Sequence, residues 1–124
     1  MCGIAGFCDF SKKSDKQTLI KMTDILHHRG PDDSGYSFYE TQFANIGLGH
    51  RRLSILDLSA HGHQPMEHSH LEIIFNGEVY NFAEISKELE SFGYIFESHS
   101  DTEVILKAYH HWGIKAVDKF IGMF

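Results

Sequence analysis

Residues 1–9 read MCGIAGFCD, and the rest of the fold is most easily predicted outward from this stretch. Residues 3–9 are mainly small and apolar, which predicts a short buried strand that begins almost at the N-terminus and holds Cys8 in the core. Cys2 directly follows the initiator methionine, and a small residue at that position permits removal of Met1. The chain would then start with a residue that carries both a thiol and a free α-amine.

A terminal α-amine could serve Cys2 as its own base. The reference pKa of an α-amine is about 7.7–8.0 and that of a cysteine thiol is about 8.5, so the amine can accept the thiol proton near neutral pH. The competing interpretation is a structural cysteine that happens to follow methionine. Position alone favours this second interpretation.

The fold class follows from the order of the predicted elements. Helices are predicted over 15–28, 82–92 and 102–112, with a last amphipathic turn over 114–121. Strands are predicted over 36–39, 44–49, 52–56, 71–75 and 94–97, and residues 59–70 are predicted as a loop. Ser14 and Gln17 form a capping box at the first helix, and Ser100 or Asp101 can cap the last. Early strands flanked by helices predict an α+β sandwich.

Composition restricts the function classes. The 124 residues suit one domain, and residues 121–124 read as the beginning of a further buried strand, so we expect a chain truncated at its C-terminal end. A net charge of −6 argues against a nucleic-acid partner. No apolar run approaches the roughly 20 residues of a membrane span, and no leader opens the chain, which predicts a cytoplasmic protein. Two cysteines do not form a disulfide framework.

Three polar groups could carry chemistry, and each has an ordinary structural alternative. Asn76 and Gly77 could donate to an oxyanion, but an Asn-Gly pair after an apolar run is also a strong hairpin signal. One side chain of the pair Arg51-Arg52 should face a cleft and could bind an α-carboxylate, although surface ion pairs are common. Asp101 could hold a substrate ammonium group, or it could only stabilise the start of a helix.

Four histidines lie close together in the predicted loop, at positions 61, 63, 68 and 70. Imidazole is the commonest metal ligand, so a zinc or nickel site is one interpretation. The segment has no nearby cysteine and matches no familiar ligand spacing. We therefore predict a solvated loop and no native metal site.

Taken together, five motifs in order make the chain resemble the class II glutamine amidotransferases, in which the N-terminal residue is the nucleophile. The resemblance is strongest to glutamine-hydrolysing asparagine synthetases. It spans the whole chain and reverses the structural interpretations of Cys2, Asn76 and Asp101. The motifs are MCGIAGF at 1–7, HHRGPDDSG at 27–35, GHRRLSILDLSAHGHQPM at 49–66, FNGEVYNF at 75–82 and SDTEVIL at 100–106.

The resemblance implies roles for individual residues. Cys2 would be the nucleophile, and Asn76 with Gly77 would form the oxyanion hole. Arg52 would bind the glutamine α-carboxylate and Asp101 the α-ammonium group. The remaining expected contacts to glutamine come from Leu53, Ser54, Ile55, Leu56 and Glu78.

The resemblance also implies an architecture and partners. It predicts an N-terminal-nucleophile hydrolase sandwich with αββα layers, here an incomplete glutaminase domain over 1–124 that needs no cofactor. ATP and magnesium would belong to a synthetase domain that is absent from this chain, and a homodimer is left open. Two alternatives stand beside asparagine synthesis: the same glutaminase step serving another acceptor, such as a surface-polysaccharide sugar, and a non-catalytic metal-binding or regulatory module.

Overall fold

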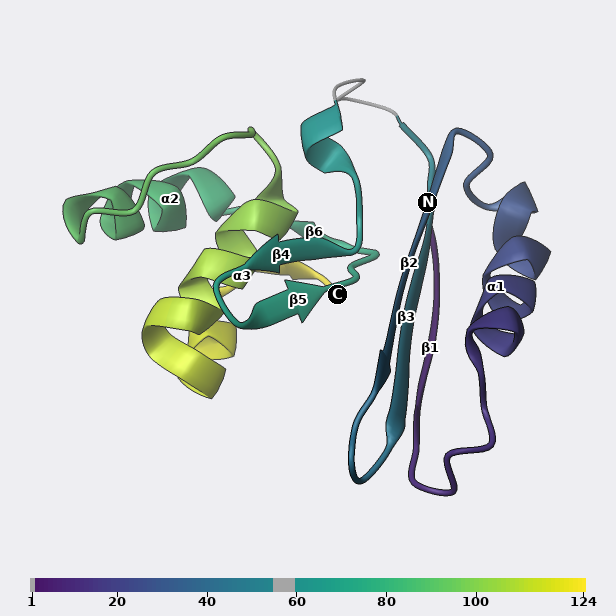
Figure 1. Ribbon diagram of the computed structural model, residues 1–124. Coiled ribbons are helices and arrows are strands. Elements are labelled where there is room, and N and C mark those ends of the chain that lie inside the picture. Colours follow the sequence, from purple (N-terminus) through teal and green to yellow (C-terminus); the bar gives the residue numbers. More distant parts are fainter. Residues whose placement is uncertain (1, 55–59) are drawn as a thin grey trace. The chain divides into compact units, whose positions relative to one another are not determined.

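The computed structural model describes residues 2–54 and 60–124, and the chain divides into two compact units. The first unit comprises Met1–Leu56, His63–Pro65 and Ile74–Asn76. The second comprises Asp57–Gly62, Met66–Ile73 and Gly77–Phe124. Helices and strands are mixed along the chain, in agreement with the predicted α+β class (Figure 1). Within the described ranges, none of the helices has the length and apolar character needed to cross a membrane.

The first unit is a three-stranded antiparallel sheet with helix α1 on one face (Figure 1). The strand order is β1-β3-β2, so β3 is central. The strands are β1 (Gly3–Asp9), β2 (Asp33–Glu40) and β3 (Asn45–Arg52), and the helical segments are α1 (Lys16–Asp24) and the 3₁₀ turn Ile25–His28.

Helix α1 lies close to β3 because two residues of β3 lack side chains on that face. A Cβ at Gly49 would lie 2.0 Å from the Thr23 hydroxyl oxygen, and one at Gly47 would lie 3.0 Å from Leu19. Leu19 and Thr23 are fully buried as a result. Since successive side chains of a strand alternate between faces, the even-numbered residues of β3 point away from α1.

The second unit is built from short strands and two helices. Its strands pair as two antiparallel ribbons, β4 with β5 and β6 with β7. Val79, Ile85, Leu89 and Val104 form part of its apolar core. The elements are the 3₁₀ turn Ala60–Gly62, β4 (Met66–His68), β5 (Leu71–Ile73), β6 (Glu78–Val79), α2 (Phe82–Ser91), α3 (Asp101–Trp112), the 3₁₀ helix Gly113–Lys119 and β7 (Gly122–Met123).

The predicted elements are largely present, with changes at their ends. The predicted 15–28 helix is α1 followed by a 3₁₀ turn, and its cap is the carboxylate of Asp15, which accepts from Thr18 N–H at 2.7 Å. The predicted Ser14 capping box is therefore wrong. Ser100 does cap α3, by accepting from Thr102 N–H.

Two strand predictions and one loop prediction need correction. Residues 94–97 form no strand. Strand β3 continues to Arg52 and ends there; residues 53–54 are not in a strand, and the rest of the predicted 52–56 strand lies outside the described residues. The predicted 59–70 loop contains β4.

Burial along two strands also differs from the prediction. β1 lies at the sheet edge and exposes alternate residues, so Cys8 is exposed rather than part of the core. Residues 122–123 do form a strand, β7, but both are exposed in this chain.

Candidate functional site

Cys2 lies at the start of β1, where the strand pairing brings it to the end of β3. The last register pair of the two strands is Gly3 with Arg51, so Cys2 comes one residue beyond it, level with Arg52. Its half-buried Sγ accepts a hydrogen bond from Leu53 N–H at 3.4 Å and lies 4.0 Å from the Leu53 carbonyl oxygen. The thiol is thus held against the backbone that directly follows Arg52.

The loop 29–32 forms hydrogen bonds with the Cys2 backbone and with the backbone of residues 52–54 beside the thiol. Arg29 Nε donates to the Cys2 carbonyl at 3.1 Å. Asp32 N–H donates to the Arg52 carbonyl at 3.1 Å, and Asp32 Oδ2 accepts from Ser54 N–H at 2.7 Å. The loop comes this close because it contains glycine: a Cβ at Gly30 would lie 2.4–2.6 Å from backbone atoms of Arg51 and Arg52.

The two neighbouring arginines have different surroundings, as strand alternation predicts. Arg51 Nη2 pairs with Asp24 of α1 at 2.5 Å, and its side chain is 14% exposed. The Tyr36 hydroxyl donates to the same carboxylate at 2.7 Å. The side chain of Arg51 therefore lies on the face of the sheet that α1 covers. Arg52 is the next residue and points to the opposite face, where its charge acts on Asp33 and His50.

Of the predicted wall residues, two can be described. Leu53 and Ser54 are half-buried and follow Arg52 directly, with their backbone N–H groups bonded to Cys2 and Asp32. The predicted contacts at Ile55 and Leu56 lie outside the described residues.

Asn76 is half-buried and belongs to the first unit. It lies in the segment 74–76, which falls between the end of β5 and the start of β6. The Asn-Gly pair therefore does not form a tight two-residue hairpin: β5 pairs with β4 before it, and β6 pairs with β7 after it. The hairpin interpretation of Asn76-Gly77 is wrong.

Gly77, Glu78 and Asp101 belong to the second unit. Asp101 is the first residue of α3, and its Oδ2 accepts from Val79 N–H of β6 at 2.9 Å. Because Ser100 is the helix cap, Asp101 is left to fix the backbone two residues beyond Gly77. Gly77 is half-buried and Glu78 is exposed.

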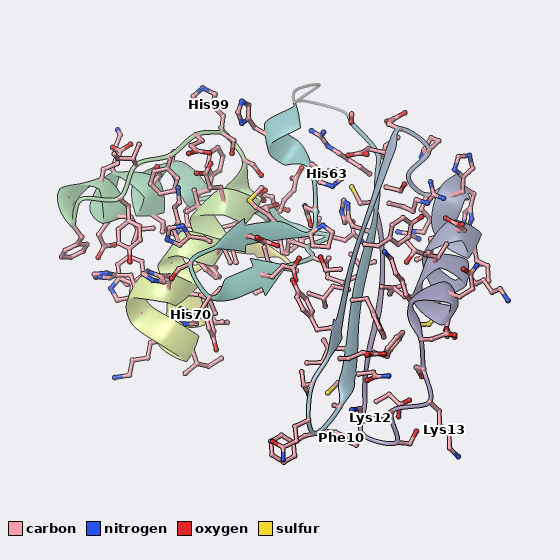
Figure 2. All side chains as sticks on the ribbon, viewed as in Figure 1. Phe10, Lys12, Lys13, His63, His70 and His99 are labelled. Carbon is pink, nitrogen blue, oxygen red and sulfur yellow. The ribbon has the colours of Figure 1, made fainter. Side chains whose placement is uncertain are left out.

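The four loop histidines are divided between the two units. His63 Nδ1 pairs with Asp33 of β2 at 2.7 Å in the first unit. His68 and His70 lie in the second unit, near His110 of α3, with ring centroids 4.8 and 5.9 Å from it; Figure 2 labels His70 at the turn after β4. His61 belongs to the second unit as well. Among the residues that the structure describes, no group of three or more His, Cys, Asp or Glu side chains could hold a metal ion.

Asp33 is the first residue of β2 and directly follows the loop 29–32, which bonds to Cys2. Burial would raise the pKa of its carboxyl, but hydrogen bonds from His63 and the Ser34 N–H, with the charges of His63 and Arg52, outweigh burial and lower that pKa. Asp33 therefore stays ionised beside Arg52.

Residues 1–124 match the family described as glutamine amidotransferase domain, and the chain belongs to that family. Over the whole chain it is 44% identical to asparagine synthetase (glutamine-hydrolyzing) 1 and 43% identical to asparagine synthetase (glutamine-hydrolyzing) 3, both from Bacillus subtilis. A relative from Gibberella zeae named amidase chry2 is 32% identical, again over the whole chain. The chain spans about a fifth of the length of each of these relatives.

Proposed function

We propose that this chain is the glutaminase part of an amidotransferase and that Cys2, after loss of Met1, is its nucleophile. The observation that carries the proposal is the placement of the Cys2 thiol just before the first residue of β1, against the backbone of Leu53, which directly follows Arg52. Membership of the glutamine amidotransferase family supplies the substrate class. A thiol with a terminal amine on the same residue is a nucleophile that carries its own base.

In the proposed reaction, the α-amine of Cys2 takes the thiol proton, and Sγ forms a bond to the side-chain amide carbon of glutamine. The Asn76 amide and the Gly77 N–H donate to the oxygen that becomes negative. The C–N bond then breaks, and the α-amine of Cys2 returns the proton to the departing ammonia. Water hydrolyses the γ-glutamyl thioester, which releases glutamate and restores the thiol.

The two charged ends of glutamine call for two charged side chains. We assign the α-carboxylate to Arg52, because Arg51 is already paired with Asp24. We assign the α-ammonium group to Asp101. Leu53, Ser54, Ile55, Leu56 and Glu78 complete the proposed set of contacts to the substrate.

The proposal extends to the longer protein of which this chain would form the N-terminal part. Within an N-terminal-nucleophile hydrolase fold with αββα layers, this domain would need no cofactor. A synthetase domain would use ATP and magnesium to activate aspartate, and the released ammonia would convert it to asparagine. This metabolic role places the protein in the cytoplasm, and a homodimer remains a prediction that a measurement of mass in solution would test.

A second candidate keeps the glutaminase step and changes the acceptor. It is favoured by the relative named as an amidase, which matches the chain over its whole length. Incubating the full-length protein with glutamine, ATP and either aspartate or another carboxylate or sugar acceptor would separate the two candidates, because only the true acceptor would be converted.

Replacing Cys2 tests the proposal, with the other cysteine of the chain as a matched control. Cys2→Ala in the full-length protein should abolish glutamate release from glutamine and leave synthesis from free ammonia intact. Cys8→Ala should retain glutaminase activity, because Cys8 is exposed on the edge strand. A Cys2→Ala protein that still hydrolyses glutamine would refute the proposed function.

A further inference from the structure

Two buried polar side chains outside the proposed site converge on one backbone position. His50 on β3 is 1% exposed and Gln64 is 7% exposed. Gln64 Oε1 accepts from Phe75 N–H at 2.6 Å. The backbone of Phe75 also interacts with the His50 imidazole and raises its pKa, as a carbonyl acceptor does, whereas Nε2 of His50 has no partner among the described residues. Both polar backbone groups of Phe75 are thus held by side chains.

These side-chain contacts to Phe75 take the place of the backbone hydrogen bonds that a neighbouring strand would supply. Segment 74–76 lies between β5 and β6 and belongs to neither strand, so its backbone groups are not paired by regular secondary structure. Buried backbone N–H and C=O groups need partners, and here Gln64 and His50 supply them. The segment therefore depends on two side chains for its position.

Both side chains are themselves fixed to the sheet of the first unit. His50 is an even-numbered residue of the central strand and shares its face with Arg52. Gln64 lies next to β2, where a Cβ at Gly35 would be 2.0 Å from the Gln64 carbonyl oxygen. The pair between His63 and Asp33 ties the same segment to the same strand.

The position that they hold is adjacent to Asn76. The carbonyl of Phe75 and the N–H of Asn76 belong to one planar peptide unit, so a hydrogen bond that fixes the carbonyl also fixes the direction in which the Asn76 backbone leaves it. An oxyanion donor is effective only when it is already in place before charge develops. Holding Phe75 is therefore a way of holding Asn76.

We propose that His50 and Gln64 are positioning residues, which clamp Phe75 so that the side-chain amide of Asn76 is presented to the oxyanion. The proposal rests on the proposed glutaminase function of this site. Neither residue touches the substrate in this scheme. Their effect falls on the transition state, where the oxyanion exists, and not on capture of glutamine.

Matched variants of each residue separate positioning from simple packing. His50→Asn keeps a donor near the place of Nδ1, whereas His50→Leu removes it. Gln64→Glu keeps an acceptor oxygen, whereas Gln64→Met has a similar shape and lacks it. The measurements, made on the full-length protein, are kcat and KM for glutamine hydrolysis, together with hydrogen exchange of the peptide that covers residues 74–77.

The donor- and acceptor-deleting variants should lower kcat by about 10- to 100-fold, because a displacement of about 1 Å at a catalytic group has an effect of that order. KM should stay within about two-fold, since ground-state binding is unchanged. Asparagine at 50 and glutamate at 64 should recover most of the lost kcat. Exchange over 74–77 should be faster in the deleting variants, and exchange in α1 should be unchanged.

Several results would overturn the proposal. They are an unchanged kcat in a folded His50→Leu protein, equal losses in the asparagine and leucine variants, or a loss confined to KM. If His50→Leu does not fold, the comparison of Gln64→Met with Gln64→Glu decides. If neither His50→Leu nor Gln64→Met folds, the two residues serve the fold and the proposal is wrong. Cys2→Ala is measured in parallel: retained hydrolysis in that variant refutes the proposed function, whereas its loss alongside an unaffected His50→Leu refutes only the positioning role.

Discussion

The burial of His50 makes a prediction about stability that does not depend on catalysis. Burial lowers the pKa of this imidazole from 6.5 to about 4, against the opposing effects of its hydrogen bond to Phe75 and the charge of Asp33, and with smaller contributions from His63 and Arg52. The unfolded chain binds a proton on His50 below about pH 6.5, and the folded protein does not until about pH 4. This contribution to stability is therefore complete above about pH 6.5 and is lost as the pH falls towards 4.

The magnitude follows from the size of the shift. At about 1.36 kcal/mol per pKa unit, the full shift corresponds to about 3 kcal/mol, and about 2 kcal/mol of it is lost between about pH 7.5 and about pH 5. Urea unfolding at these two pH values should show a fall in the free energy of unfolding that is about 2 kcal/mol larger in the wild type than in His50→Asn, which cannot titrate at this position.

Comparison with His50→Asn is needed because other groups titrate in the same range. His68 also has a lowered pKa and is retained in the variant, so its contribution cancels in the difference. Equal losses of stability in the two proteins would show that His50 is not held neutral by burial. They would also remove the support that this buried imidazole gives to the clamp on Phe75.

Two further predictions concern the charged groups and the oxyanion. Arg52→Ala and Asp101→Ala should each lower kcat/KM for glutamine by an amount equivalent to about 1.5–3 kcal/mol, the usual cost of losing a charge-assisted partner. Arg51→Ala should be much milder in this assay. Equal losses at Arg51 and Arg52 would contradict the assignment of faces. Asn76→Asp should lower kcat by at least about 10²–10³-fold, because it replaces a hydrogen-bond donor to the oxyanion by a negative charge. A thermal melt should show that the variant is folded. A folded variant with a kcat within a few fold of the wild-type value would remove Asn76 from the mechanism.

Local patterns were sufficient to predict most elements, and they failed where a side chain replaced a backbone partner. Residues 94–97 have the composition of a strand, but the N–H groups of Glu97 and Ser98 donate to the Glu103 carboxylate at 2.9 and 2.8 Å, and Lys107 Nζ bonds to the Ile95 carbonyl. These backbone groups have side-chain partners in place of a neighbouring strand. A pattern of alternating residues does not distinguish these two ways of pairing the backbone.

The same limit applies at the first helix. Ser14 and Gln17 fit a capping box, yet the Ser14 N–H donates to Asp9 at 2.8 Å and its carbonyl accepts from Asn45 at 2.9 Å. Ser14 is thereby tied to the last residue of β1 and the first residue of β3, and Asp15 becomes the cap. Contacts over more than 30 residues decided between two adjacent candidates, and helix propensity alone could not.

Within the candidate site, resemblance supplied the roles, and strand alternation supplied part of the geometry. The prediction that only one of Arg51 and Arg52 faces a cleft needs only the two-residue period of a strand, and Asp24 shows which face Arg51 takes. Asp32, His50 and Gln64 were missed. Asp32 and Gln64 lie in loops and bond to Ser54 and Phe75, and His50 lies within β3 and interacts with Phe75. Each partner lies elsewhere in the chain, so no local pattern marks these residues.

The register of β1 against β3 explains why a terminal cysteine can belong to a site at all. Chain termini are usually poorly ordered, and a nucleophile there would ordinarily lack a fixed position. Here seven consecutive register pairs, from Asp9 with Asn45 to Gly3 with Arg51, align the first strand with the central one. A slip of one residue would exchange the faces of every β1 side chain relative to its neighbours and would place Cys2 beside a different residue of β3. The position of the thiol next to Leu53 is therefore a property of the whole strand pair, and the loop 29–32 secures it at the end where the pairing stops.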